Sequence, residues 1–195
     1  MIDEIVLATG NRGKVKEFEG LLHGIAGRII GLGDLESPPE VVEDGETFME
    51  NALKKARTIA KYSGKPALAD DSGLAVDALG GKPGVYSARY SGEDATDEKN
   101  IDKLLRELGD AEHRSARFVC FLALVTPDGK ETVVSGKCEG VILTERRGSG
   151  GFGYDPVFYL PEYERTMAEI PPDLKNRISH RARAAEKLVR ILNGE

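Results

Sequence analysis

Cysteine is scarce in this chain of 195 residues, which contains only two. Cys120 and Cys138 are too few for a disulfide framework, and their spacing does not match a zinc site. We therefore expect both to be small buried side chains in a reducing compartment, and we predict a cytoplasmic protein.

Long apolar runs and a surplus of positive charge are also missing. No stretch approaches the roughly 20 apolar residues of a membrane span, and the N-terminal sequence has no basic region of a signal peptide, so we expect no membrane partner. The formal net charge of −6 argues against a nucleic-acid partner. The 27 lysines and arginines still allow a local basic pocket for a small polyanion.

What is present is the pattern of an α/β protein. Strands are expected in 4–10, 28–32 and 65–73, helices in 14–24, 47–64, 95–109 and 178–194, and a hairpin over 116–143. Strands alternate with helices in the first half, and the hairpin dominates the middle. We predict a long mixed β-sheet flanked by helices. No repeat or linker divides the chain, so residues 1–195 are interpreted as a single domain.

The stretch "GSGGFGYDP" contains a G-x-G-x-x-G pattern, Gly148 to Gly153, which is typical of dinucleotide-binding loops. Such a loop requires a helix directly after its glycines, because the helix N-terminus binds the pyrophosphate. The following "YDPVFYLP" has two prolines and aromatic or β-branched residues, which indicate an extended segment. The dinucleotide interpretation is therefore rejected.

A base-binding loop is the favoured alternative for this stretch. Glycines allow the backbone to approach a flat ligand closely, and a ring at Phe152 or Tyr154 can stack on it. Asp155 can accept hydrogen bonds. A flexible turn between strands remains the other interpretation.

The segment "TGNRGK" lies where the first expected strand meets the first expected helix. It does not match G-x-x-x-x-G-K-[ST], because its glycines are too close and valine follows the lysine. Backbone amides at a helix start, an asparagine amide and an ammonium group still suit a polyphosphate. An ordinary capped helix with a solvated lysine is the alternative. The residues concerned are Thr9, Gly10, Asn11, Arg12, Gly13 and Lys14.

Two adjacent acids, Asp70 and Asp71, come at the end of the apolar run in 65–73. Adjacent carboxylates repel unless a cation or a raised pKa relieves them, and such oxygen ligands suit Mg²⁺ bridging to substrate phosphates. A solvated turn is the alternative. Further acids, including Glu43, precede the helix of 47–64, where they also complement the helix dipole.

That helix opens with a capping box at Thr47 and Glu50. Asn51 and Lys55 are four residues apart and share one helix face, and both are candidate substrate-site residues. On the substrate side, Lys55 could pair with an acid or a phosphate; a lysine that faces solvent would have no special role. Near the C-terminus, Ser179 is a candidate N-cap for the last helix, and Lys175, Arg177, His180 and Arg181 gather around it. These donors predict a site for an anion or a base edge.

Taken together, "TGNRGK", "TFMENALKKA", "LADDSGLAVDALGGKPGVYSARYSG", "GFGYDPVF" and "ISHR" resemble, in order, the inosine triphosphate pyrophosphatase family. The match runs over essentially the whole chain, and the long third block is similar to the bacterial branch. The resemblance implies hydrolysis of aberrant purine nucleoside triphosphates (XTP, ITP, dITP) to the monophosphate and pyrophosphate. It also implies two lobes around a central cleft, a homodimer and a Mg²⁺ requirement.

The resemblance also implies residue roles. Residues 9–14 and Lys55 would hold the triphosphate. Asp71 would be metal ligand and proton acceptor, with Asp70 supporting it and Ser72 contacting substrate. Glu43 is the predicted second metal ligand, although Val42 stands where many relatives carry a neighbouring acid. The purine and ribose would be held by Phe152, Gly153, Tyr154, Asp155, Lys175, His180 and Arg181.

Two alternatives to this function stay open. A related pyrophosphatase acting on modified pyrimidine triphosphates would share the phosphate chemistry but select another base. A non-catalytic nucleotide-binding domain would need only the pockets, and it gives no reason for an acid pair beside a phosphate segment.

Overall fold

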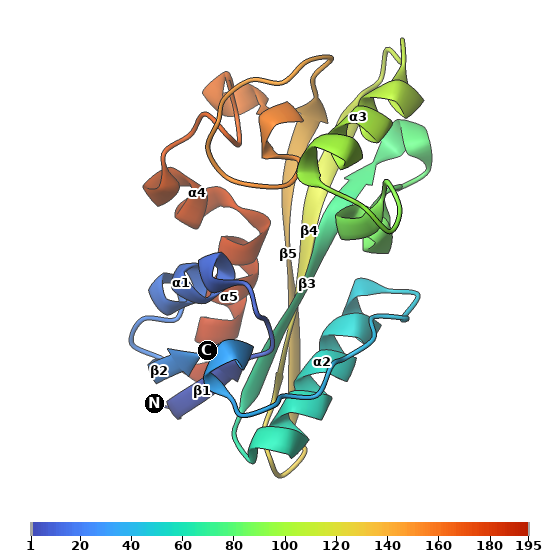
Figure 1. Ribbon diagram of the computed structural model, residues 1–195. Helices are drawn as coiled ribbons and strands as arrows, with labels where there is room; N and C mark the ends of the chain where they lie inside the picture. Colours follow the sequence, from blue (N-terminus) through green and yellow to red (C-terminus); the bar gives the residue numbers. More distant parts are fainter. Residues whose placement is uncertain (1, 195) are drawn as a thin grey trace. The chain divides into compact units, whose positions relative to one another are not determined.

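A computed structural model describes residues 2–194 (Figure 1). Seven strands form one sheet in the order β2-β1-β3-β4-β5-β6-β7. The strands are β1 Ile2–Leu7, β2 Ala26–Ile30, β3 Ala67–Val76, β4 Ser115–Val125, β5 Glu131–Ile142, β6 Phe158–Leu160 and β7 Arg165–Thr166. The helices are α1 Arg12–Leu21, α2 Phe48–Ser63, α3 Asp97–Leu108, α4 Pro172–Ile178 and α5 His180–Leu192.

The sheet is mixed, as predicted. β1 pairs in parallel with both β2 and β3, which are reached through helical connections, whereas β6 pairs antiparallel with β5 and with β7. β4 and β5 are neighbours joined by residues 126–130, where Gly129 adopts φ +88°. The long hairpin expected from the sequence is therefore confirmed.

The described residues form two compact units. Unit 1 comprises 2–71, 120–136 and 181–194, and unit 2 comprises 72–119 and 137–180. β3, β4 and β5 contribute residues to both units, so each strand changes unit along its length. The predicted arrangement of two lobes around a cleft stays a prediction.

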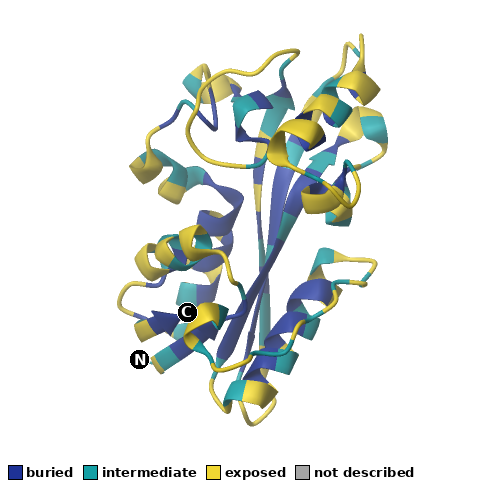
Figure 2. Ribbon diagram, viewed as in Figure 1, coloured by how far each residue is buried: buried dark blue, intermediate teal, exposed yellow. Residues whose placement is uncertain are grey.

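In unit 1 the strands are covered on both faces. One apolar cluster packs α1 and α5, through residues such as Phe18 and Leu188, against strand residues such as Leu68. A second cluster joins α2 to the opposite strand faces through residues such as Ala56, Ile59 and Ala69. Figures 1 and 2 show α1 and α5 on one side of these strands, α2 on the other, and buried strand residues between them.

In unit 2 one apolar cluster packs α3 against the sheet. Ile101, Leu104 and Leu108 of α3 are buried, while Leu105 is half-buried against the same cluster. Tyr154 and Phe158 belong to the same cluster, so the chain after the glycine loop is fixed in the core.

Three local expectations need correction. β3 does not end at the two acids but continues to Val76, so Asp70 and Asp71 lie in the middle of a buried strand. The residues before the last helix form a separate helix, α4, which carries Lys175 and Arg177. The glycine loop leads into a 3-10 helix, Asp155–Val157, before β6, rather than directly into an extended segment. No dinucleotide-type α-helix starts there, so the rejection of that motif is unchanged.

Candidate active site

The start of α2 positions the acidic segment before it. Thr47 Oγ1 accepts the Glu50 N–H at 3.2 Å, and a Glu50 carboxylate oxygen accepts the Thr47 N–H at 3.1 Å, which confirms the capping box. One turn on, the buried Asn51 Oδ1 accepts the Gly45 N–H at 2.8 Å. Asn51 thereby ties Gly45 to the helix, and its predicted contact with substrate stays a prediction.

Lys55, on the same face of α2, brings the acids together. Its Nζ donates to the backbone oxygen of Asp70 at 2.7 Å. The same ammonium lies 3.2 Å from Glu43 Oε2 and 3.8 Å from Asp71 Oδ1. Lys55 is buried, so one desolvated ammonium faces two carboxylates of different segments.

Asp71 has the more unusual environment of these two acids. It is buried, and its Oδ2 has no hydrogen-bond partner among residues 2–194. Burial raises the pKa of Asp71 from 3.8 to about 7; the Lys55 ammonium opposes this and the Glu43 carboxylate adds to it. A carboxyl with this pKa can gain or lose a proton at neutral pH, which is the range that a general base requires.

Glu43 and Asp71 fit a hard divalent cation. Within the described residues no cluster of three or more His, Cys, Asp or Glu side chains could hold a metal by itself. Mg²⁺, however, is commonly bound by one or two carboxylates, with phosphate oxygens and water completing its shell. A buried carboxylate oxygen without a hydrogen-bond donor is the group that such a cation would satisfy.

The Asp70 side chain belongs to a different set of contacts. Its Oδ1 lies 2.6 Å from Lys14 Nζ, and its Oδ2 lies 3.0 Å from Arg181 Nε and 3.3 Å from Cys120 Sγ. Successive residues of a strand point to opposite sheet faces. The repulsion between Asp70 and Asp71 is relieved in the two ways the sequence allowed: each acid faces its own cations, and the pKa of Asp71 is raised.

Arg181 is part of this Asp70 cluster. Its guanidinium is buried, and burial acts to lower its pKa, but the carboxylates of Asp70 and Glu17 outweigh burial and raise it. Arg181 therefore stays charged at every physiological pH. Its predicted contact with the base stays a prediction, because in this structure its Nε already donates to Asp70.

Residues 9–14 form a capped helix start. The Asn11 side chain is the N-cap of α1 and accepts the N–H groups of Gly13 and Lys14, at 2.8 and 3.2 Å. Thr9 Oγ1 accepts the Asn11 N–H at 3.2 Å. Three amides expected to face phosphate are thus internally bonded, so a phosphate would compete with side-chain acceptors for them. Gly10 and Arg12 are exposed, and the triphosphate role of the segment stays a prediction.

In unit 2 the glycine loop presents an aromatic ring beside a cation. Phe152 is 46% exposed, and Lys175 Nζ lies 4.7 Å from the centre of its ring. The same ammonium is 2.6 Å from Asp155 Oδ2, which also accepts the Phe152 N–H at 3.0 Å. Asp155 is buried and thus orients both partners. An exposed ring with a fixed ammonium over it suits the flat face of a base.

The other predicted substrate-contact residues of unit 2 are less exposed to solvent than Phe152. Tyr154 is buried in the core, and its hydroxyl donates to the Ser87 backbone oxygen at 2.7 Å, so Phe152 is the ring of the pair that is exposed. His180 is buried and its ring stacks on Phe118, with 4.9 Å between centroids. Ser72 is half-buried and follows Asp71 in β3. Their substrate contacts stay predictions.

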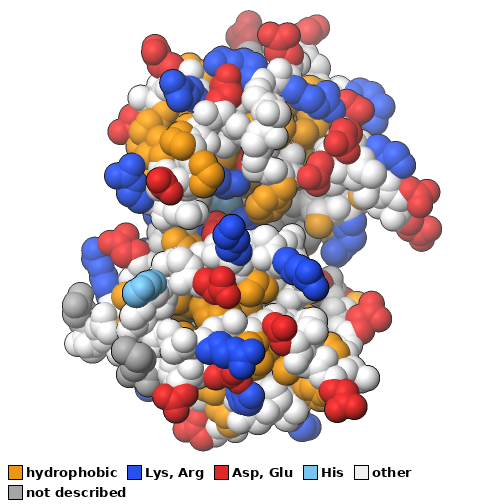
Figure 3. Space-filling view, turned by 60° about the vertical axis from the view of Figure 1, so that its left-hand side comes forward, with side chains coloured by type: hydrophobic (Ala, Val, Ile, Leu, Met, Phe, Trp, Pro, Cys, Tyr) orange, Lys and Arg blue, Asp and Glu red, His pale blue; other side chains and the backbone are white. Residues whose placement is uncertain are grey.

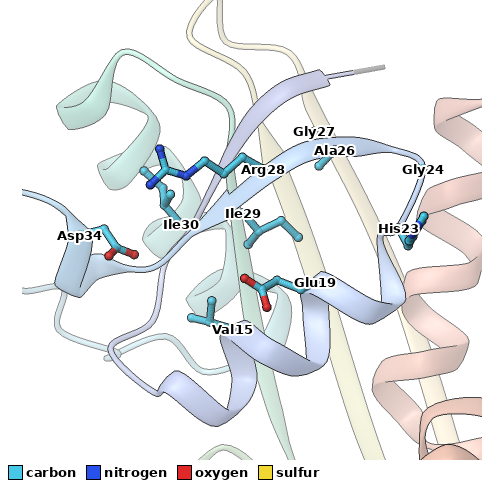
Figure 4. A pocket seen from close by; sticks show the side chains of 10 residues that line it. All are labelled: Val15, Glu19, His23, Gly24, Ala26, Gly27, Arg28, Ile29, Ile30 and Asp34. Carbon is cyan, nitrogen blue, oxygen red and sulfur yellow. The ribbon is translucent and has the colours of Figure 1, made fainter.

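A pocket of about 580 Å³ is present in unit 1. Figure 4 shows it between α1 and β2, with Val15 and Glu19 on the helix facing Ile29 on the strand. None of the predicted site residues lines it. Its size alone gives no reason to place chemistry there, because its acidic residues Glu19 and Asp34 are exposed, unlike the buried Asp71.

The raised pKa of Asp71 predicts a pH dependence of stability. A carboxyl that titrates at 3.8 when unfolded and about 7 when folded contributes stability below pH 3.8, and this is lost as pH rises through about 7. The loss is on the order of 4 kcal/mol. We expect denaturant unfolding of the metal-free protein to give a lower free energy at about pH 8 than at about pH 5. Asp71→Asn should reduce this difference; an unchanged difference in the variant would contradict the shift.

Sequence reasoning missed three members of these clusters. Cys120 was expected only as a small apolar side chain, yet its thiol contacts Asp70. Glu17 lies 3.9 Å from Arg181, and Asp97 accepts the Gly153 N–H at 2.7 Å. The only available signal was for Asp97, an acid at a helix start, and that signal indicates dipole complementarity rather than a contact with the glycine loop.

These features define an α/β protein with a carboxylate–lysine cluster suited to a metal-bound phosphate group. The chain belongs to the Ham1 family, whose model matches residues 5–191, and this confirms the resemblance found in the sequence. It is 56% identical over 182 residues to the dITP/XTP pyrophosphatase of Geobacter sulfurreducens, covering 92% of each chain. It is 55% identical to that of Desulfotalea psychrophila, covering 96% of this chain and 84% of the relative.

Solved structures agree with the fold. A HAM1 protein from Coxiella burnetii superposes with a TM-score of 0.91 at 45% identity, covering 100% of both chains. The Staphylococcus aureus Ham1 protein superposes with a TM-score of 0.90 at 44% identity, covering 98% of this chain and 99% of that one. The predicted mixed α/β fold of this family is therefore confirmed.

Proposed function

We propose that this protein hydrolyses aberrant purine nucleoside triphosphates, XTP, dITP and ITP, to the nucleoside monophosphate and pyrophosphate, and so keeps them out of DNA and RNA. Relatives that share more than half of its sequence are dITP/XTP pyrophosphatases. The structural observation that carries the proposal is the Lys55 ammonium between the Glu43 and Asp71 carboxylates, because it combines a metal-ligand pair, a titratable base and a cation.

Glu43 and Asp71 would hold Mg²⁺. Bound there, the ion supplies charge stabilisation to phosphate oxygens. Asp71 orients the attacking water through a carboxylate oxygen and accepts its proton, for which a pKa of about 7 is suited. The water attacks the α-phosphorus opposite the pyrophosphate leaving group, and the P–O bond to that group breaks.

Lys55 and Lys14 act on the negative charge of the phosphates. Lys55 is fixed by Asp70 backbone oxygen at 2.7 Å, and Lys14 by the Asp70 side chain at 2.6 Å, so both ammonium groups are pre-positioned. A charge held in place before the reaction needs no reorganisation during it, which is where most of the catalysis is expected. Asp70 therefore supports the reaction by orienting two lysines.

Base recognition is assigned to unit 2. The exposed Phe152 ring stacks on the purine, and Lys175 adds a positive charge at the same place. Hypoxanthine and xanthine carry a carbonyl at C6, which accepts hydrogen bonds, whereas adenine carries an amino group. Loop amides were the expected donors, but those of Gly150, Phe152, Gly153 and Asp155 already have acceptors. Lys175 and His180 are then the donors that best suit the C6 oxygen.

A nucleotide panel tests this function. With Mg²⁺ we expect pyrophosphate release from XTP, dITP and ITP to exceed that from ATP by about 100-fold or more in kcat/KM, because adenine leaves buried donors unpaired. Ion-exchange separation of products distinguishes pyrophosphate from single phosphates. Equal rates on all purine triphosphates, or stepwise release of phosphate, would contradict the proposal.

The same panel decides the other candidates. Preference for a modified pyrimidine triphosphate would assign the chain to the pyrimidine class, and binding of ITP without metal-dependent turnover would make it a binding domain.

The predicted homodimer and cytoplasmic location remain proposals; light scattering of the purified protein tests the homodimer. Acidic and basic side chains are interspersed over the face in Figure 3, in keeping with a small-molecule substrate. Among residues 2–194 no helix is long and apolar enough to cross a bilayer.

A further inference from the structure

Two carboxylates hold consecutive amides of the glycine loop. Asp155 Oδ2 accepts the Phe152 N–H at 3.0 Å, and Asp97 Oδ2 accepts the Gly153 N–H at 2.7 Å. Asp155 lies two residues after Gly153, whereas Asp97 is 56 residues away from Gly153 in sequence, in the first turn of α3. Asp97 thus connects the loop to a separate element of unit 2.

The loop needs such a connection because its own backbone is permissive. Gly151 and Gly153, on either side of Phe152, adopt φ +71° and +60°, a left-handed conformation that costs glycine little. The Phe152 ring is 46% exposed, so packing alone does not fix it. Hydrogen bonds to the backbone on both sides of its Cα therefore help to set the direction of the ring, together with the Lys175 ammonium beside it.

α3 is a rigid support for this contact. Ile101 and Leu104 are buried in the core of unit 2, and Thr96 caps the helix by accepting the Lys99 N–H at 3.2 Å. The residue after Gly153 is fixed as well, since the Tyr154 hydroxyl donates to the Ser87 backbone oxygen. A bond from Asp97 to Gly153 therefore transmits the position of a packed helix to the exposed ring.

We propose that Asp97 is a positioning residue for purine recognition: it pre-orients the glycine loop so that the Phe152 ring is ready to stack on the base. The inference rests on the proposed function and adds a determinant of base affinity outside the residues that contact substrate. Loss of this bond leaves the ring mobile before binding, and ordering it then opposes the binding of substrate.

The first test compares three variants of the full chain. Asp97→Ala should raise KM for XTP by about 10-fold and change kcat by less than about 3-fold. The variant loses a hydrogen bond to a charged group that positions the loop but takes no part in the chemical step. Asp97→Asn keeps an acceptor oxygen and should recover most of the affinity. Glu98→Ala is the matched control, because it removes a neighbouring exposed acid from the first turn of α3. Among the hydrogen bonds and ion pairs of residues 2–194, none joins the Glu98 side chain to the loop. Glu98→Ala should behave as the wild type.

The second test does not depend on activity. The chain has no tryptophan, so Phe152→Trp places a single fluorophore in the loop. In that background, Asp97→Ala should lower the fluorescence anisotropy and increase acrylamide quenching, and Glu98→Ala should not. Equal anisotropy and equal KM for the Asp97→Ala and Glu98→Ala variants would overturn the inference. Absence of XTP hydrolysis in the wild type would instead reject the proposed function, and the fluorescence comparison would still decide the role of Asp97.

Discussion

Asp71→Asn is expected to lower kcat by about 10²- to 10⁴-fold while substrate binding is largely retained. Asparagine is nearly isosteric and stays neutral, so it cannot accept the proton of the attacking water. The same change removes a buried carboxyl whose ionisation is costly, since burial is the largest cause of its raised pKa. We therefore expect the variant to be at least as stable as the wild type above neutral pH, which excludes unfolding as the reason for lost turnover.

Asp44→Asn is the control for this experiment. Asp44 is in the same acidic segment as Glu43, but it is exposed and pairs with Lys54 at 2.5 Å. Steady-state kinetics with XTP should give near-normal kcat for Asp44→Asn. Near-normal kcat in Asp71→Asn would remove Asp71 from the role of base, and a large effect of Asp44→Asn would show that any acid lost from this region is harmful.

Lys55→Met is expected to lower kcat by about 10²- to 10³-fold, the range found when one pre-positioned charge or donor is removed from a catalytic site. Methionine keeps much of the side-chain volume, but it leaves Glu43 and Asp71 facing each other without their shared ammonium. The pKa of Asp71 should rise further, because the attraction that Lys55 exerts on its ionised form is lost. The pH at which activity is half-maximal should shift upward.

The adjacent residue provides a matched comparison. Lys54→Met removes the same charge from the same helix turn, but Lys54 is half-exposed and pairs only with the surface acid Asp44 in the contacts described. Such surface pairs contribute at most about 1 kcal/mol to stability. Thermal unfolding of both variants, together with kcat for XTP, separates catalysis from folding. If Lys55→Met and Lys54→Met had equal kcat, Lys55 would have no direct part in the reaction.

Local sequence signals predicted much of this structure. The capping box at Thr47 and Glu50 and the helices expected in 47–64 and 95–109 depend on residues within a few positions of one another. The same holds for the shared face of Asn51 and Lys55, both of which are buried. Such features are set by helix periodicity and by the demands of helix ends, which a sequence displays directly.

The contacts that form the candidate site, in contrast, join residues that are far apart in the sequence. Asp70 meets Lys14 from 56 residues away and Arg181 from 111 residues away, and no local pattern encodes those distances. The length of β3 was also misjudged, because "DSG" has the composition of a turn. The segment stays extended to Val76, because Leu74 and Val76 are buried in the apolar core of unit 2. The metal-ligand and base-contact assignments came from the family resemblance and stay predictions.

The alternation of faces along β3 restricts how this protein can change in evolution. Asp70 and Asp71 meet different partners only because they are consecutive in an extended strand. One residue inserted or deleted between Ala67 and Asp70 would exchange the faces of both acids, and each would then meet the wrong cations. A substitution here alters one contact, whereas a change of length alters all of them at once. We therefore expect relatives to vary in length at the turn of 126–130 and to keep the length of β3 fixed.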